Sequence, residues 1–169
     1  MKKLINLLTV GLISVPLLAN DLTISLSTTE RPRNLGGISE NYEPKRLHLE
    51  FEEEGRFLYL QTGRDDGMSD YALGTGWIWN FKNIFSKLGG GLGYLSDDFK
   101  KHTYNLNFHF IGEVGIRLPL NSCDLSLSRY LDHFSVGRDN NPFIDRNGRN
   151  NGVNLYGWKG GIICPIGKT

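Results

Sequence analysis

Apolar and polar residues alternate along one segment of this chain after another, and this pattern constrains the fold most. Between Tyr104 and Phe110, aromatic or aliphatic residues occupy every second position, with Asn105, Asn107 and His109 between them. The same period recurs near 22–27, 46–51, 114–118, 123–132 and 156–162, and more weakly near 56–62, 71–79 and 86–95. A period of two is that of a β-strand, whose successive side chains point to opposite faces. The pattern predicts about eight strands and negligible helix.

The length of the segments and their polar faces favour a membrane barrel over a soluble sandwich, which also alternates but turns its apolar face inward. Several segments run to about ten residues, the length that a tilted strand needs to cross a bilayer. Charges and glycines on the polar face suit the narrow lumen of an eight-stranded barrel. We therefore predict an all-β, eight-stranded antiparallel transmembrane β-barrel formed by residues 20–169 as one domain.

Two sets of side chains follow from that fold. The first would form an ion-pair network in the lumen, with a solvated polar face as the alternative: Arg46, Glu50, Glu113, Arg117 and Lys159. The second would form aromatic girdles at the membrane interfaces: Tyr71, Trp77, Trp79, Tyr94, Tyr156 and Trp158.

The N-terminus has the pattern of a secretory signal peptide. Met1-Lys2-Lys3 is basic, and the apolar run from Leu4 to Ala19 is short and contains Pro16, which argues against a membrane anchor. We expect residues 1–19 to be cleaved on export. The net charge of +1 gives no indication of a nucleic-acid partner.

Two cysteines in an exported chain indicate a disulfide rather than a metal site. The three histidines outside the pair described next have no suitably spaced ligand partners, and we assign them to the lumen or to loops: His48, His102 and His109. No metal or cofactor is expected.

A histidine and a serine two positions apart, His133 and Ser135, lie in one of the alternating segments. On a strand they share a face, where an imidazole can take the proton of a hydroxyl group. If the next segment pairs with this one so that Asn154 lies opposite His133, the same register places Cys123 opposite Cys164. One register therefore supplies an amide that can orient the imidazole and a disulfide, and it indicates a hydrolytic site on a sheet.

Parity places His133 and Ser135 on the outer, lipid-facing side of the barrel. Arg129 falls on the same side, where a charge near the bilayer midplane costs up to a few kcal/mol. Either Arg129 reaches a lipid phosphate, or a β-bulge between Arg129 and His133 shifts the parity. We favour the bulge, which would weaken the register for the cysteines. The alternative to a disulfide is that Cys123 and Cys164 are two small lipid-facing residues.

The long polar segment 137–151 is rich in Asn, Arg, Asp and Gly and has the character of an outer loop. It joins the strand of His133 to that of Asn154, so the site is expected at the outer rim. The cysteines would lie about 33 Å further along the strand, at about 3.3 Å per residue, near the periplasmic end.

The run His133-Phe134-Ser135, a polar loop and Asn151-Gly152-Val153-Asn154 resemble the PagL-type lipid A deacylases of the acyloxyacyl hydrolase family. Leu106-Asn107-Phe108 and Ile111-Gly112-Glu113-Val114-Gly115 are also similar to a strand of that family. The resemblance covers roughly residues 86–163. It implies an eight-stranded outer-membrane barrel that hydrolyses an ester-linked acyl chain of lipid A, usually at the 3-position, without a metal.

The resemblance assigns the nucleophile to Ser135 and the general base to His133. Asn154 aligns with the third member, often a Glu, and an amide can fix the imidazole tautomer although it cannot offset the imidazolium charge. Val136 stands where the family usually has Asn, so backbone N–H groups of Val136 and Gly137 are the candidates for stabilising the oxyanion. Two loop carboxylates could substitute for the missing one: Asp139 and Asp145.

Three functions remain open from the sequence. The first is a lipid A deacylase, whose substrate is lipopolysaccharide and whose surroundings are the lipids of the outer membrane. The second is a catalytically inactive structural or adhesive barrel, which the residues Val136 and Asn154 keep open. The third is acyl transfer or phospholipid hydrolysis by the same side chains.

Overall fold

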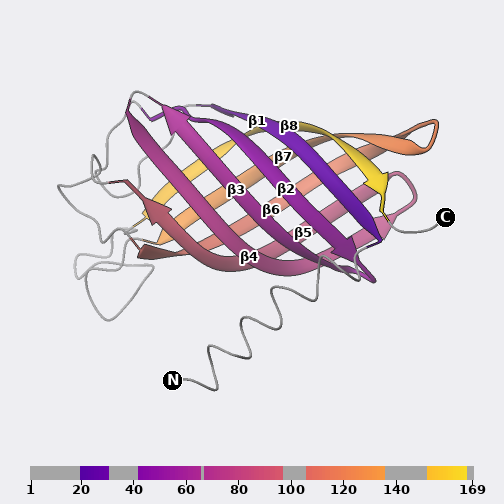
Figure 1. Cartoon of the computed structure of the whole chain (residues 1–169), viewed down its shortest axis with the longest axis horizontal. Helices are drawn as coiled ribbons and strands as arrows, with labels where there is room; N and C mark the ends of the chain where they lie inside the picture. Colours follow the sequence, from indigo (N-terminus) through magenta and orange to yellow (C-terminus); the bar gives the residue numbers. More distant parts are fainter. Residues whose placement is uncertain (1–19, 31–41, 66, 97–105, 136–151, 167–169) are drawn as a thin grey trace, which may run out of the picture.

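The chain folds into one closed antiparallel barrel of eight strands in which each strand pairs with its neighbours in sequence and β8 closes on β1 (Figure 1). This computed structural model describes residues 20–30, 42–65, 67–96, 106–135 and 152–166, and of Gly152 and Val153 the backbone alone. The strands are β1 (Asp21–Glu30), β2 (Lys45–Glu53), β3 (Arg56–Asp65), β4 (Met68–Phe81), β5 (Ile84–Leu95), β6 (Leu106–Leu120), β7 (Cys123–Ser135) and β8 (Gly152–Pro165).

The structure confirms the predicted all-β class and the eight-stranded antiparallel barrel. The three weakly patterned segments are strands as well, and each is longer than the sequence pattern indicated. β6 continues to Leu120, and only Asn121 and Ser122 form the turn to β7. Among the described residues there is no helix long and apolar enough to cross a membrane.

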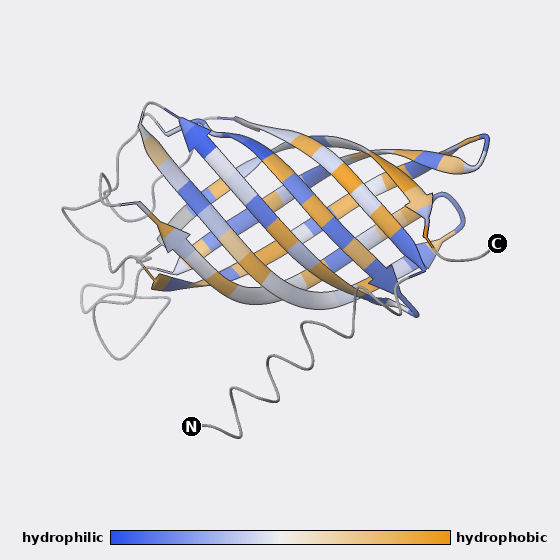
Figure 2. Cartoon of the chain, in the orientation of Figure 1, coloured by the Kyte–Doolittle hydropathy of each residue, from blue (hydrophilic) through white to orange (hydrophobic). Residues whose placement is uncertain are grey.

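The alternation in the sequence becomes an inside and an outside of the barrel. Apolar and polar residues form alternating bands along every strand (Figure 2), and the apolar members face outward. Large exposed side chains on the exterior include Leu26, Trp77, Trp79, Leu88, Phe108, Val114, Leu127 and Trp158. Such an exterior is the reverse of a soluble protein, in which contiguous apolar surface of this extent is rare.

The predicted girdle residues lie on this exterior. Tyr71 and Tyr94 are cross-strand partners with ring centroids 6.2 Å apart, and they lie near the end of the barrel where β4 begins and β5 ends. Trp77 and Trp79 lie further along β4 towards the opposite end and are more than half exposed. The aromatic side chains are therefore separated along the barrel axis.

The lumen is filled by side chains. The half of it nearer the end where β1 and β7 begin contains an ion-pair network. Lys159 contacts Glu50 and lies 2.6 Å from the Glu113 carboxylate. Lys87 contacts Glu50 and lies 2.6 Å from Glu52, and Arg117 lies 2.6 Å from the other oxygen of Glu52. All of these side chains are buried or nearly so. The network contains four of the five residues expected from the sequence, and Lys87 and Glu52 in addition.

The fifth expected residue, Arg46, belongs to a separate cluster nearer the other end. Its guanidinium contacts Asp132 and lies 3.0 Å from Asp70, and all three side chains are buried. Gln61 donates to Asp132 at 3.0 Å. Tyr42 donates a hydrogen bond to Asp70, and the Arg46 guanidinium lies over the Phe134 ring, with 5.5 Å from Cζ to the ring centroid. Phe57 and Phe85 lie instead beside Lys87 of the first network.

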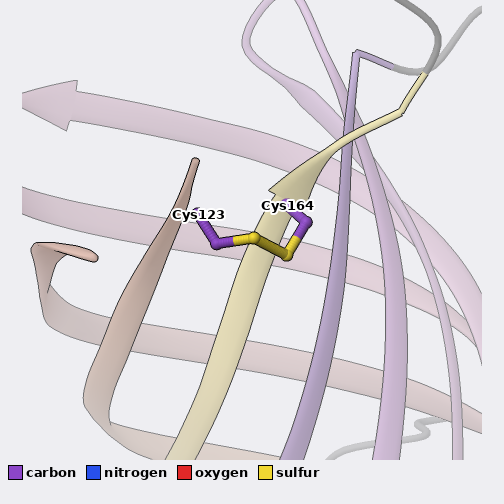
Figure 3. Close-up of a disulfide and its surroundings, with 2 residues drawn as sticks. All are labelled: Cys123 and Cys164. Atoms are coloured by element: carbon purple, nitrogen blue, oxygen red, sulfur yellow. A yellow bond between two sulfur atoms is a disulfide. The ribbon is translucent and has the colours of Figure 1, made fainter. Parts of the chain in front are cut away.

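The register between β7 and β8 follows the predicted pairing without interruption from Asp124–Ile163 to Ser135–Gly152. At its far end Cys123 and Cys164 form a disulfide that joins the two strands (Figure 3). The bulge that we favoured for Arg129 is therefore wrong: Arg129 pairs with Trp158 and His133 pairs with Asn154 in one continuous ladder.

Arg129 remains on the exterior because another strand supplies its counter-charge. Its guanidinium forms a bidentate pair with the Glu30 carboxylate of β1, one of the two contacts being 3.0 Å. It also stacks on Trp158, with 4.8 Å from Cζ to the ring centroid. Pairing and stacking lower the cost of a charge on this face.

Two neighbouring glycines of β5 differ in the room they leave for a methyl group, and we expect their alanine variants to differ in stability. A Cβ on Gly91 would lie 2.0 Å from the Leu73 carbonyl oxygen, whereas one on Gly90 would meet nothing closer than 3.4 Å. We expect Gly91→Ala to lower the free energy of unfolding by about 1–3 kcal/mol and Gly90→Ala to change it little. Urea unfolding in detergent micelles, followed by tryptophan fluorescence, measures both. Equal midpoints for the two variants would contradict the packing described.

Removal of Lys159 should leave Glu113 buried without its ammonium partner. We expect Lys159→Met to lower the free energy of unfolding by about 3–5 kcal/mol, in the same micellar assay. Lys82→Met removes an exposed lysine from the turn between β4 and β5 and should stay within about 0.5 kcal/mol of wild type. A Lys159→Met barrel as stable as wild type would show that the pair contributes no net stability.

Candidate active site

Three polar residues share the outward face at one end of β7 and β8. His133 lies directly opposite Asn154, and Ser135 lies opposite Gly152 on the same pair of strands. Ser135 is the last residue of β7, so the site lies at the end of the barrel from which β7 runs into the segment 136–151. The structure thus brings His133 and Asn154 together and places Ser135 on their face of the sheet.

The imidazole of His133 is oriented by Asn154. Its Nδ1 lies 2.7 Å from Oδ1 of Asn154. An amide oxygen only accepts hydrogen bonds, so Nδ1–H is the donor and the neutral ring carries its lone pair on Nε2. This is the tautomer that a general base acting through Nε2 requires.

The neighbouring strand β6 supplies two aromatic residues that sequence analysis had not assigned to the site. On β6, Phe110 pairs with His133 and Phe108 pairs with Ser135. The Phe110 ring lies 6.1 Å from the imidazole, and Phe108 is 59% exposed. The alternation of β6 predicts their outward direction, but only the register shows that they flank this site.

Inward-facing residues of β7 hold the backbone beneath the site. Asp132 contacts Arg46 and accepts a hydrogen bond from Gln61, and the Phe134 ring packs 4.5 Å from the His109 ring. Both Asp132 and Phe134 are completely buried. Because they alternate with His133 and Ser135, the lumen fixes the position of the outward pair.

The exposure of the candidate residues differs from the expectation. His133 and Asn154 are partly buried, and Ser135 is only 2% exposed although its parity is outward. The candidates for the oxyanion, Val136 and Gly137, and the loop carboxylates Asp139 and Asp145 lie outside the described residues, as does the expected signal peptide 1–19.

The remaining histidines lie where the sequence placed them, as far as they are described. His48 lies 2.7 Å from the Ser27 hydroxyl, and His109 lies 2.7 Å from the Tyr59 hydroxyl, both in the lumen; His102 is outside the described residues. Within the described ranges no group of three or more His, Cys, Asp or Glu side chains is arranged to hold a metal ion.

Comparison with known proteins identifies no family for the chain. No family model matches it, and no curated protein matches it. Two solved structures are similar in fold. The crystal structure of the outer membrane enzyme PagL is 14% identical, covers 86% of this chain and 99% of its own, and superposes with a TM-score of 0.47. That of Neisserial surface protein A (NspA) is 10% identical, covers 86% and 95%, and has the same TM-score.

Removal of the Asn154 side chain should change the balance between the two neutral tautomers of the His133 imidazole. We expect ¹⁵N-histidine spectra at alkaline pH to show His133 as the Nδ1–H form, and Asn154→Ala to shift the population towards Nε2–H. Asn80→Ala, at an exposed position near the end of β4, is the matched control and should leave the spectrum unchanged. An Nε2–H form in the wild-type protein would contradict the assigned hydrogen bond.

Proposed function

We propose that this chain is an outer-membrane esterase that hydrolyses an ester-linked acyl chain from lipid A. The observation that carries the proposal is the hydrogen bond of 2.7 Å between His133 Nδ1 and Asn154 Oδ1, with Ser135 on the same face of β7. A base of fixed tautomer beside a serine has little structural purpose on an apolar barrel exterior, but it suits a substrate that is itself a lipid.

Placement in the membrane is supported by the exterior of the barrel. Its strands are 9–15 residues long, enough to cross a bilayer when tilted, and their outward side chains are mainly apolar. An outer membrane is the setting in which bacterial barrels of this size occur. The lipid A substrate, and cleavage at the 3-position, rest on the sequence resemblance to the PagL-type deacylases.

In the proposed mechanism His133 Nε2 takes the proton of the Ser135 hydroxyl as Oγ attacks the acyl carbonyl carbon. The tetrahedral intermediate collapses to an acyl-serine, and the imidazolium donates its proton to the departing sugar oxygen. Water, deprotonated by the same imidazole, then hydrolyses the acyl-serine and releases the fatty acid. Asn154 keeps Nδ1–H oriented throughout, and backbone N–H groups at Val136 and Gly137 are proposed to stabilise the oxyanion.

A catalytically inactive structural or adhesive barrel is the second candidate. Two observations favour it: Ser135 is 2% exposed, and Asn154 provides an amide where a carboxylate would stabilise the imidazolium that forms during catalysis.

Mass spectrometry of lipid A from cells that express the chain tests the proposal. We expect wild type to remove one acyl chain and Ser135→Ala to reduce this by about a thousandfold or more, because the nucleophile is lost. Ser126→Ala, the same change on the inward face of the same strand, is the control and should act like wild type.

Each barrel is first shown to be folded by its heat-modifiable migration on gels. Activity of Ser135→Ala equal to wild type would refute Ser135 as the nucleophile. Unchanged lipid A with folded wild-type protein would favour the inactive barrel, or, if phospholipids lose acyl chains instead, a different ester substrate.

A further inference from the structure

A groove of about 610 Å³ lies on β1, β2, β3 and β8, and its lining includes none of the three residues of the proposed active site. Its lining includes two cations, Lys45 and Arg64, and apolar side chains below them. Neither the proposed hydrolysis nor the lumen network uses these residues.

The cations lie side by side at one end of the barrel. Lys45 is the first residue of β2, Arg64 is the penultimate residue of β3, and the two are cross-strand partners. Both are exposed and alternate with inward neighbours, so they face outward. β2 begins at the end of the barrel where β7 ends. Lys45 and Arg64 therefore lie at the same end as Ser135.

The apolar part of the groove continues from the cations along the exterior. Leu47 and Leu26 are cross-strand partners with exposures of 40% and 67%. Trp158 forms a wall. Gly160 pairs with Leu26, and a Cβ there would have only the Ser126 carbonyl oxygen nearby, at 4.0 Å. Gly160 is therefore a low point in the exterior, separated from Leu47 by Leu26 on β1.

In the described part of the chain, the acidic residues near the groove form no ion pair with Lys45 or Arg64. Glu30 is held by Arg129. Asp65 accepts the backbone N–H of Glu43 at 2.7 Å. Lys45 and Arg64 thus combine a positive rim with an apolar channel on a surface that faces outward.

From this arrangement we propose that the groove binds one anionic, phosphate-bearing lipid, with its phosphate between Lys45 and Arg64 and an acyl chain along Leu26, Leu47 and Gly160. Cations at the level of lipid headgroups attract anionic phosphates, and lysine and arginine can keep their charged ends at that level while their stems contact apolar surface. The inference takes from the proposed function only the placement of the barrel in a membrane, and not the hydrolysis.

The test is titration of three probes into the barrel in uncharged detergent micelles, followed by native mass spectrometry: dioleoylphosphatidate, dioleoylglycerol and inorganic phosphate. All measurements use the Ser135→Ala background, so that no probe can be cleaved by the proposed nucleophile. We expect phosphatidate to bind and the other two to bind much more weakly, because only it offers both the charge and the chains.

Lys45→Gln/Arg64→Gln should weaken phosphatidate binding about thirtyfold, the effect expected of two cations near a headgroup. Arg56→Gln/Lys82→Gln removes the same charge from exposed positions at the opposite end of β3 and β4 and should leave the affinity unchanged. Gly160→Leu should reduce binding about tenfold by filling the channel, whereas Gly112→Leu, at an outward glycine with nothing within 4 Å of its Cβ, should not.

Equal binding of phosphatidate to wild type and to Lys45→Gln/Arg64→Gln would overturn the proposal. So would dioleoylglycerol binding as tightly as phosphatidate, which would mean an apolar groove without phosphate recognition. Inorganic phosphate binding as tightly as the lipid would mean a free-anion site, and would also overturn it. These outcomes are independent of lipid A deacylation, so this inference and the proposed function can fail separately.

Discussion

The pairing of buried charges inside a closed barrel is the constraint on which the rest of the structure depends. An eight-stranded barrel has a lumen just wide enough for side chains to fill, and a charge there must find a partner because water cannot reach it. Lys87 and Lys159 each meet two carboxylates, and Arg46 meets Asp70 and Asp132. These contacts cross the lumen and join strands that are not neighbours in the sheet.

The candidate site depends on that interior although it lies outside. In β7 the inward residues Asp132 and Phe134 are packed and paired in the lumen, and the outward residues His133 and Ser135 alternate with them. A strand held from within cannot slip, because a shift of one residue would turn every side chain to the opposite face. The hydrogen bond between His133 and Asn154 is therefore a consequence of how the lumen packs.

Local pattern predicted a large part of this protein, and particular residues show where it failed. The opposition of His133 to Asn154 and of Cys123 to Cys164 followed from counting along two alternating segments. The bulge expected at Arg129 was wrong, because Glu30 pairs with Arg129 on the exterior and no shift of parity is needed. Glu30 is 99 residues away in sequence, so the local pattern could not indicate this pair. Lys87 and Asp70 were overlooked as lumen charges, although the alternation Phe85-Ser86-Lys87 carries the signal for the first.

The sequence by itself determined the strands, their two faces and the order of polar and apolar positions, because these depend on the two-residue period of a strand. Only the tertiary structure decided which charges pair, that Ser135 is buried, and that Lys45, Arg64, Trp158 and Gly160 border one groove. The reason is physical: closing the sheet brings β8 beside β1, and contacts across that closure depend on shear and packing that no local pattern encodes.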